Sequence, residues 1–195
     1  MPHLPRSWFA RDARVVARAL LGCLLVHERA AKGEARIARI VETEAYRGPK
    51  DLACHARVGL TGRTRVLLGQ EGRAYVYFVY GMHDCFNVTC LGEGEGHAVL
   101  VRAGEAEAGL EEGTRLDGPG RFARGMGITT AMSGQDLTRG PLYLLPRVGR
   151  LRIGVSARVG VGYAGEWADR PWRFFDAASQ QVSKPPRSAI GRSSP

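Results

Sequence analysis

Hydrophobic and polar residues alternate along the chain in patterns that predict both helices and strands. Between residues 11 and 21 apolar residues recur at helical spacing and Gly22 ends the run, so this pattern predicts an amphipathic helix. Residues 24–27 and 35–46 carry strand patterns. A Lys-Gly pair at residues 32–33 predicts the turn that joins these two strands into a hairpin.

The strongest strand pattern is RAYVYFVY at residues 73–80, which follows a loop-like stretch rich in Gly, Arg and Thr at residues 47–72. Residues 81–84 predict a turn into a second strand at residues 85–91. The remaining patterns predict a helix that opens at residues 117–120, with Pro119 in its first turn, and runs through Phe122 to Met126. They also predict strands at 98–102, 142–145 and 151–161.

The length of 195 residues fits one compact domain, to which we assign residues 1–177. Residues 178–195 contain Ser, Pro and Gln with few apolar residues, and this composition predicts a frayed or disordered tail. No internal repeat and no linker divides the remainder of the sequence.

The charged residues of the chain suggest a class of partner. The 28 Lys and Arg outnumber the 19 Asp and Glu, which gives a net charge of +9, and 25 of the 28 are arginine. Arginine binds phosphate through two donors and stacks on planar rings, which favours a polyanionic partner, nucleic acid above all. A basic surface that only keeps the protein soluble fits the charge equally well.

The cysteines and the N-terminal residues indicate where the protein works. Four cysteines, at positions 23, 54, 85 and 90, lack the spacing of a zinc site or a small disulfide scaffold, so we expect reduced thiols inside the cell. The first residues carry no signal-peptide pattern, and no run of apolar residues is long enough to span a bilayer. We therefore expect a cytoplasmic protein, associated with the nucleoid if bacterial, without membrane contacts.

Carboxylates, aromatic residues and an arginine recur near the predicted strand ends. The stretch RIVETEAY places Glu42, Glu44 and Tyr46 at alternate positions on one face of a strand, and VLVR ends on Arg102. A carboxylate beside an arginine can hold and deprotonate a water, and aromatic faces can clamp a flat ring. Taken alone, however, Glu44 fits a solvated strand residue better than a catalytic one. For Glu42 we expect only the ordinary role of supporting its neighbours or contacting solvent.

Two other features need separate interpretations. Tyr77 and Tyr80 differ by three positions and face opposite sides of a regular strand, so they require different roles. By itself Tyr77 fits a half-buried sheet tyrosine. His83, Asp84 and Cys85 are possible metal ligands, but neighbours in one turn cannot converge on one ion without strain, so we expect no metal there.

Five longer blocks cover most of the chain: RIVETEAYRGPKDLACH (39–55), YVYFVYGMHDCFNVT (75–89), VLVRAGE (99–105), LDGPGRFARGMGI (116–128) and RVGVGYAGEWADRPWRFF (158–175). Together they resemble the alkyladenine, or methylpurine, DNA glycosylases. The resemblance implies a single compact domain of mixed α/β (α+β) class, in which helices flank a curved antiparallel sheet. It also implies a monomer that acts on double-stranded DNA containing damaged purines, without metal or cofactor.

The resemblance assigns a catalytic role to three residues. Glu44 matches the general base for the attacking water, and Arg102 matches a side chain that helps to hold this water. The backbone carbonyl near Val159 would complete the position of the water.

Five further residues match positions that handle the substrate. Tyr46, His55 and Tyr77 match the residues that enclose the extruded base, and Asn87 matches the residue that crowds the 2-amino group of guanine. Tyr80 matches the wedge that enters the duplex in place of the base. His83 and Asp84 depart from the more hydrophobic residues expected after YGM, which bears on the range of lesions.

These assignments lead to a hypothesis about the reaction. A ring-alkylated purine is cationic, so aromatic faces attract it by about 0.5 to 2 kcal/mol, and its charge makes it a good leaving group. We expect a monofunctional glycosylase that excises such purines, with hypoxanthine as a further substrate, and leaves a free abasic site because no lysine matches a Schiff-base position. A non-catalytic protein that shields damaged bases is the alternative. A nucleoside hydrolase fits the charge and Tyr80 less well.

Overall fold

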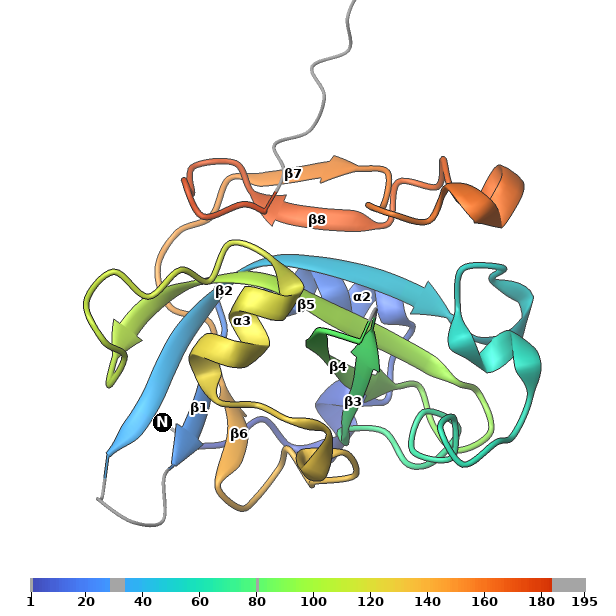
Figure 1. Cartoon of the computed structure of the whole chain (residues 1–195), viewed down its shortest axis with the longest axis horizontal. Coiled ribbons are helices and arrows are strands. Elements are labelled where there is room, and N and C mark those ends of the chain that lie inside the picture. Colours follow the sequence, from blue (N-terminus) through green and yellow to red (C-terminus); the bar gives the residue numbers. More distant parts are fainter. Residues whose placement is uncertain (1, 29–33, 80, 184–195) are drawn as a thin grey trace, which may run out of the picture.

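The computed structural model describes residues 2–28, 34–79 and 81–183 (Figure 1). In this part of the chain the α-helices are α1 (Arg6–Phe9), α2 (Ala13–Leu20) and α3 (Pro119–Met126). The strands are β1 (Leu24–Glu28), β2 (Ala35–Arg47), β3 (Ala74–Val79), β4 (His83–Cys90), β5 (His97–Ala108), β6 (Leu142–Leu145), β7 (Ile153–Ser156) and β8 (Arg173–Asp176). Short 3₁₀ turns span Gly48–Lys50, His55–Val58, Thr130–Met132 and Gly162–Trp167. None of the helices described has the length and apolar character that crossing a bilayer requires.

The strands form one antiparallel sheet in the order β3-β4-β5-β2-β1-β6. The long strand β2 pairs with β5 along one edge and divides its other edge between two partners. Its first half pairs with β1, and Glu42–Glu44 pair with β8, which in turn pairs with β7. Figure 1 shows β7 and β8 together at the top, beyond β2. The sheet therefore brings the C-terminal strands against the middle of β2.

Helices cover the sheet from both sides (Figure 1). Behind it, α2 packs on β2, where the Thr43 hydroxyl donates a hydrogen bond of 2.8 Å to the Ala17 carbonyl. In front, α3 packs on β4 and β5 through a buried face that includes Phe122. A Cβ on Gly104 of β5 would lie 2.7 Å from the Phe122 ring, so the glycine allows the helix to approach this closely. Burial of such an aromatic side chain stabilises the fold by about 1.5 to 3 kcal/mol.

Two irregularities face each other in the β2–β5 ladder. Between Ile40 and Glu42 the extra residue Val41 has no partner in β5, and one step further Arg102 has no partner in β2. Bulges of this kind bend a strand and redirect a side chain, and they often lie beside active sites. Because the two insertions lie on opposite strands, the register is the same before and after them.

The structure confirms the mixed α/β (α+β) fold with a curved antiparallel sheet, and both long predicted helices. It corrects three strands. His83 and Asp84 begin β4 instead of forming a turn, β5 continues well beyond Arg102, and β7 covers only a small part of the predicted strand at 151–161. The helix α1 and the strand β8 had no counterpart in the prediction. The predicted turn at residues 32–33 lies outside the described residues.

The stretch after Ala177 also differs from the expectation. Residues 178–183, predicted to be a frayed tail, lie against the sheet, where Ser179 and Ser183 bond to Glu105 and Glu42. The hydrogen-bonding side chains of these serines offset the low hydrophobicity on which the prediction was based. The rest of the predicted tail lies outside the described residues.

Candidate active site

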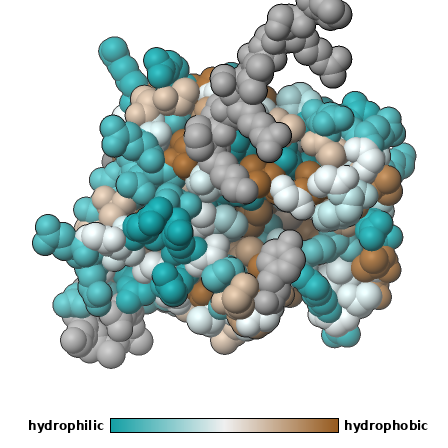
Figure 2. Space-filling view, turned by 45° about the horizontal axis from the view of Figure 1, so that its top comes forward, coloured by the Kyte–Doolittle hydropathy of each residue, from teal (hydrophilic) through white to brown (hydrophobic). Residues whose placement is uncertain are grey.

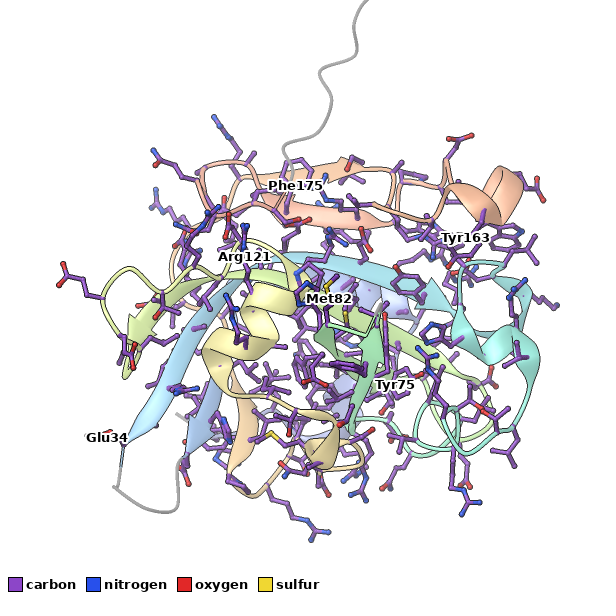
Figure 3. The ribbon with its side chains drawn as sticks, viewed as in Figure 1. Glu34, Tyr75, Met82, Arg121, Tyr163 and Phe175 are labelled. Carbon is purple, nitrogen blue, oxygen red and sulfur yellow. The ribbon has the colours of Figure 1, made fainter. Side chains whose placement is uncertain are left out.

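A cavity of about 350 Å³ lies over β3, β4 and β5. Its walls come from these strands, from Tyr46 at the end of β2, from residues 53–55 and 159–163, and from the first residues of α3. Figure 3 shows Tyr75 on β3, Met82 at the tip of the β3–β4 hairpin and Tyr163 beside the segment that follows β2. Segments that are far apart in the sequence therefore meet at this cavity.

The strand register sets the floor of this cavity. Tyr75 pairs with Asn87, Asn87 with Leu100, and Leu100 with Glu44, so one row of directly opposed residues crosses four strands. Opposed residues in antiparallel strands share a face of the sheet. The row therefore aligns Glu44 with cavity residues that are far from it in the sequence.

Glu44 lies behind the cavity wall, with a side chain that is 0% exposed. Its Oε1 atom accepts a hydrogen bond of 2.7 Å from the Val159 amide and lies 3.4 Å from Arg102 Nη1. Its Oε2 atom accepts a hydrogen bond of 2.9 Å from the Tyr46 hydroxyl. All three partners line the cavity, so Glu44 connects to the cavity through each of them. A carboxylate oxygen can accept two hydrogen bonds, so Oε2 retains capacity for a second donor on the Tyr46 side.

Arg102 connects two buried carboxylates. Its Nε atom donates to Glu42 Oε1 at 2.8 Å, and its Nη1 atom faces Glu44. Burial alone lowers the pKa of Arg102, but the charges of Glu44 and Glu42 outweigh this effect and hold the pKa above its usual range. Arg173 adds a second guanidinium, which donates to Glu42 Oε1 at 2.6 Å. The buried cluster of two carboxylates and two guanidinium groups is thus balanced in charge.

Glu42 is therefore not the solvent-contacting residue that strand alternation allowed. Its side chain is 0% exposed and is bound by both arginines. The alternative role considered for it, support of its neighbours, agrees with these contacts.

Aromatic rings form the opposite wall of the cavity. The Tyr77 ring lies 4.6 Å from the His55 ring and 5.5 Å from the Tyr75 ring, measured between centroids. The His55 Nδ1 atom lies 3.0 Å from the Tyr75 hydroxyl. Burial, and then the charge of Arg63, lower the pKa of His55 to about 4, so the imidazole is neutral near pH 7. Burial raises the pKa of Tyr77, which stays protonated.

The amide of Asn87 is fixed at the cavity floor. Its Nδ2 atom donates to the Tyr75 carbonyl at 3.1 Å and to the Cys85 carbonyl at 3.3 Å. Both N–H groups point to the backbone, which holds the side chain in one orientation. Cys85 and Cys54 also line the cavity, and burial raises the pKa of each thiol to about 11, so neither forms a thiolate near neutral pH.

A buried ion pair anchors the segment that carries Val159. The side chains of Arg158 and Asp51 are both 0% exposed and are joined by hydrogen bonds of 2.6 and 2.9 Å. Arg158 also donates to the Ala45 carbonyl, and its guanidinium lies 4.8 Å from the Tyr46 ring centroid. Burial lowers the pKa of Arg158. The hydrogen bonds and the charge of Asp51 outweigh this effect, so the pKa lies above its usual range. The ion pair thus holds β2 and the 159–161 segment together beside Glu44.

The structure brings together most of the residues that the sequence singled out. Those that line the cavity are Tyr46, His55, Tyr77, Asn87, Arg102 and Val159, and Glu44 contacts three of them. The amide of Val159 contacts Glu44, and the expected role of the nearby carbonyl in placing the water stays a prediction. Tyr80 lies outside the described residues, so its wedge role also stays a prediction.

Several residues at the site escaped the sequence reasoning. Arg158, Asp51 and Arg173 are buried and paired, but the sequence marks them only as charged residues inside longer blocks. Only Arg173 carries a signal, because it lies between Trp172 and Phe174, which pack in the interior. Among the described residues, no three His, Cys, Asp or Glu side chains converge as metal ligands would.

The sequence is similar to known proteins along most of its length. The sequence model of a family described as methylpurine-DNA glycosylase matches residues 7–180. A protein of Myxococcus xanthus, with the provisional name 3-methyladenine DNA glycosylase, is 52% identical over 95% of this chain and 96% of its own. Proteins with the same provisional name from Anaeromyxobacter dehalogenans and Methanocella arvoryzae are 48% and 46% identical, over 95% and 94% of this chain and 88% and 97% of their own. The chain therefore belongs to the methylpurine-DNA glycosylase family.

Proposed function

We propose that this protein hydrolyses the N-glycosidic bond of alkylated purines in double-stranded DNA, with a water that Glu44 activates. The observation that carries the proposal is the position of Glu44, buried against Arg102, Tyr46 and the Val159 amide at the edge of an aromatic cavity. The proposal includes monofunctional action, in which the product is a free abasic site, and action as a monomer.

The charge distribution of the cavity supports a cationic substrate. His55 is neutral near pH 7, and the hydroxyls of Tyr46 and Tyr77 keep their protons because burial raises the pKa of each. Uncharged aromatic rings attract a cation through their faces, whereas a protonated histidine would repel it. A ring-alkylated purine carries this positive charge. The charge strengthens its binding to the aromatic rings and weakens its glycosidic bond.

The carboxylate supports the chemical step in two ways. As the bond breaks, the sugar gains positive charge, which a nearby carboxylate stabilises, and the same carboxylate can take a proton from the attacking water. Arg102 and the Val159 amide both contact Oε1, which leaves Oε2 on the side of Tyr46 and the cavity. To reach this site a base must leave the duplex, which is least costly for damaged and weakly paired bases.

Replacement of Glu44 by glutamine tests the proposal. The variant keeps the size of the side chain but cannot accept a proton, so base release should fall by at least about a hundredfold while lesion binding persists. Glu34→Gln is the matched control, because Glu34 is exposed and lies at the far end of the molecule from Tyr163 (Figure 3). Excision by Glu44→Gln at the wild-type rate would contradict the assigned role.

The substrate requires a separate measurement. Duplexes that each contain one 3-methyladenine, 7-methylguanine, hypoxanthine or ethenoadenine should be incubated with the protein, and the released base quantified. Strand breaks should arise only after alkali, because the product is an abasic site. Tight lesion binding with no released base from any duplex would favour the non-catalytic alternative, and strand breaks without alkali would contradict monofunctional action.

A further inference from the structure

The segment after β8 returns to the buried charge cluster and ends against Glu42. The Ser183 amide donates to Glu42 Oε2 at 2.6 Å, and the Ser183 hydroxyl donates to Glu42 Oε1 at 2.9 Å. The same hydroxyl oxygen accepts a hydrogen bond of 3.1 Å from Arg102 Nη2. A residue far from β2 and β5 in the sequence thus bridges the carboxylate of one strand and the guanidinium of the other.

With Ser183 in place, the Arg102 guanidinium is held at three of its nitrogen atoms. Nε donates to Glu42, Nη2 donates to Ser183, and Nη1 faces Glu44. A planar group fixed at Nε alone can still turn about that contact. The bond at Nη2 prevents this rotation, so it sets the direction in which Nη1 points.

The environment makes the direction of Nη1 important. The Arg102 side chain is 8% exposed, and both carboxylates are 0% exposed, so little water is available to compensate for a lost contact. Hydrogen bonds to charged groups in such surroundings are among the strongest in proteins. Glu42 already binds Arg173 as well, and it competes with Glu44 for Arg102.

We propose that Ser183 is a positioning residue for catalysis, because its hydroxyl and amide hold Glu42 and Arg102 in the arrangement that directs Arg102 toward Glu44. The inference rests on the proposed function, since it concerns the residues that act on the water. Ser183 touches neither the cavity nor the reacting atoms, and it acts only through Arg102 and Glu42.

The chain offers a matched control within the same segment. The Ser179 hydroxyl also donates to a carboxylate, that of Glu105, which pairs with Arg39 at another part of the β2–β5 ladder. Glu105 has no contact with Arg102 or Glu44 among the described residues. Loss of the Ser179 hydroxyl therefore loosens the segment without disturbing the catalytic cluster.

The test compares Ser183→Ala, Ser183→Thr, Ser183→Pro and Ser179→Ala in the full chain. Single-turnover base release is measured with a lesion duplex, together with the Kd for a duplex that contains a tetrahydrofuran abasic analogue, and with Tm. Ser183→Ala should slow release about tenfold, and Ser183→Pro, which also lacks the amide donor, should slow it further. Ser183→Thr keeps the hydroxyl and should restore release to within about twofold of wild type. The Kd should be unchanged, as should the release rate of Ser179→Ala.

A readout independent of activity separates this inference from the proposed function. The side-chain NMR signal of Arg102, assigned by its loss in Arg102→Lys, should exchange with solvent faster in Ser183→Ala than in wild type or Ser179→Ala. Unchanged exchange and release in folded Ser183→Ala would overturn the inference alone. An equal loss of release in Ser179→Ala would overturn it too, because general docking of the segment would then explain the effect. An inactive wild-type protein would instead refute the proposed function, while the NMR comparison still reports on Ser183.

Discussion

Tyr46 combines two contacts in one side chain. Its ring lines the cavity, and its hydroxyl donates to Glu44 Oε2 at 2.9 Å. Burial and the charge of Glu44 raise the pKa of Tyr46 well above its usual value, so the hydroxyl remains a donor near neutral pH. A residue assigned by resemblance to base stacking therefore also contacts the Glu44 carboxylate.

The two roles of Tyr46 can be separated by Tyr46→Phe. The variant keeps the ring but leaves Glu44 without one donor, so we expect base release to fall about tenfold with little change in affinity for a lesion duplex. Single-turnover release and fluorescence binding on the same duplex measure the two quantities. A loss confined to affinity would show that the hydroxyl has no part in the chemical step.

His55 predicts a dependence of stability on pH. Its pKa is about 4 in the folded protein and 6.5 in the unfolded chain, because burial and Arg63 disfavour its protonated form. As pH falls from 6.5 toward 4 the unfolded state takes up a proton first, so His55 contributes stability above pH 6.5 that is lost across this interval. The free energy of unfolding of wild type should therefore decline more steeply than that of His55→Gln.

Urea unfolding of the two proteins at several pH values between 7 and 4 measures this difference. Other acidic groups titrate in both proteins and cancel in the comparison. Parallel pH profiles for wild type and His55→Gln would mean that the imidazole titrates normally in the folded state.

At the residue scale, the sequence identified the cavity residues through their resemblance to a family and missed the residues that hold them in place. Glu44 and Arg102 belong to two of the five blocks that carry the resemblance. Glu42, by contrast, reads as a polar strand residue, because alternation reports which side a residue faces and not what covers that side. Its burial depends on Arg173 and Ser183, both of which lie far away in the sequence.

At the scale of elements, the Arg158–Asp51 pair joins β2 to the segment that carries Val159. Asp51→Asn would leave the Arg158 charge buried without its partner, and breaking such pairs typically costs about 3 to 5 kcal/mol. We expect a matching fall in the free energy of unfolding, measured with urea. Asp117→Asn is the control, because Asp117 pairs with exposed arginines and its loss should cost at most about 1 kcal/mol. Equal losses in the two variants would contradict the structural role of the buried pair.

The elements that sequence patterns predicted are those whose burial follows a regular period. Residues 13–20 and 119–126 form helices with one apolar face, as predicted. The strand β8, RFFD, has a charged residue at each end, and both are buried in ion pairs with distant partners. Its sequence therefore lacks the alternation of apolar and polar residues that marks a strand. The helix α1 is a single turn and too short to show one. The predicted strand at 151–161 ends early, and Gly160 has a φ of +77°, which a regular strand does not contain.

At the scale of the whole molecule, the face shown in Figure 2 is largely hydrophilic with separate apolar patches. A second cavity, of about 280 Å³, adjoins the first and shares His55 and Tyr163 with it. Arg57 lines this second cavity, is exposed, and has no carboxylate partner among the described residues. The net charge of +9 favours binding to a polyanion, and Arg57 has the exposure that a phosphate contact requires.

Salt dependence tests this electrostatic contribution. The logarithm of the affinity for undamaged duplex DNA should fall linearly with the logarithm of salt concentration, and each phosphate contact contributes about 0.9 to the slope. Arg57→Gln should reduce the slope by about one contact. Arg115→Gln should change it less, because Arg115 is already paired with Asp117. An unaltered slope for Arg57→Gln would place the phosphate contacts elsewhere.

The facing bulges at Val41 and Arg102 have a consequence for how this site can change over time. Loss of one residue from β2 alone would shift by one position the pairing of β2 with β5 beyond the bulges. This shift would turn Tyr46 to the opposite face of the sheet. Loss of one residue from β5 would restore the spacing, but the residue at the irregularity is the arginine itself. Strand length and Arg102 are thus constrained together: a deletion on either strand either misaligns the cavity wall or removes the group that faces Glu44.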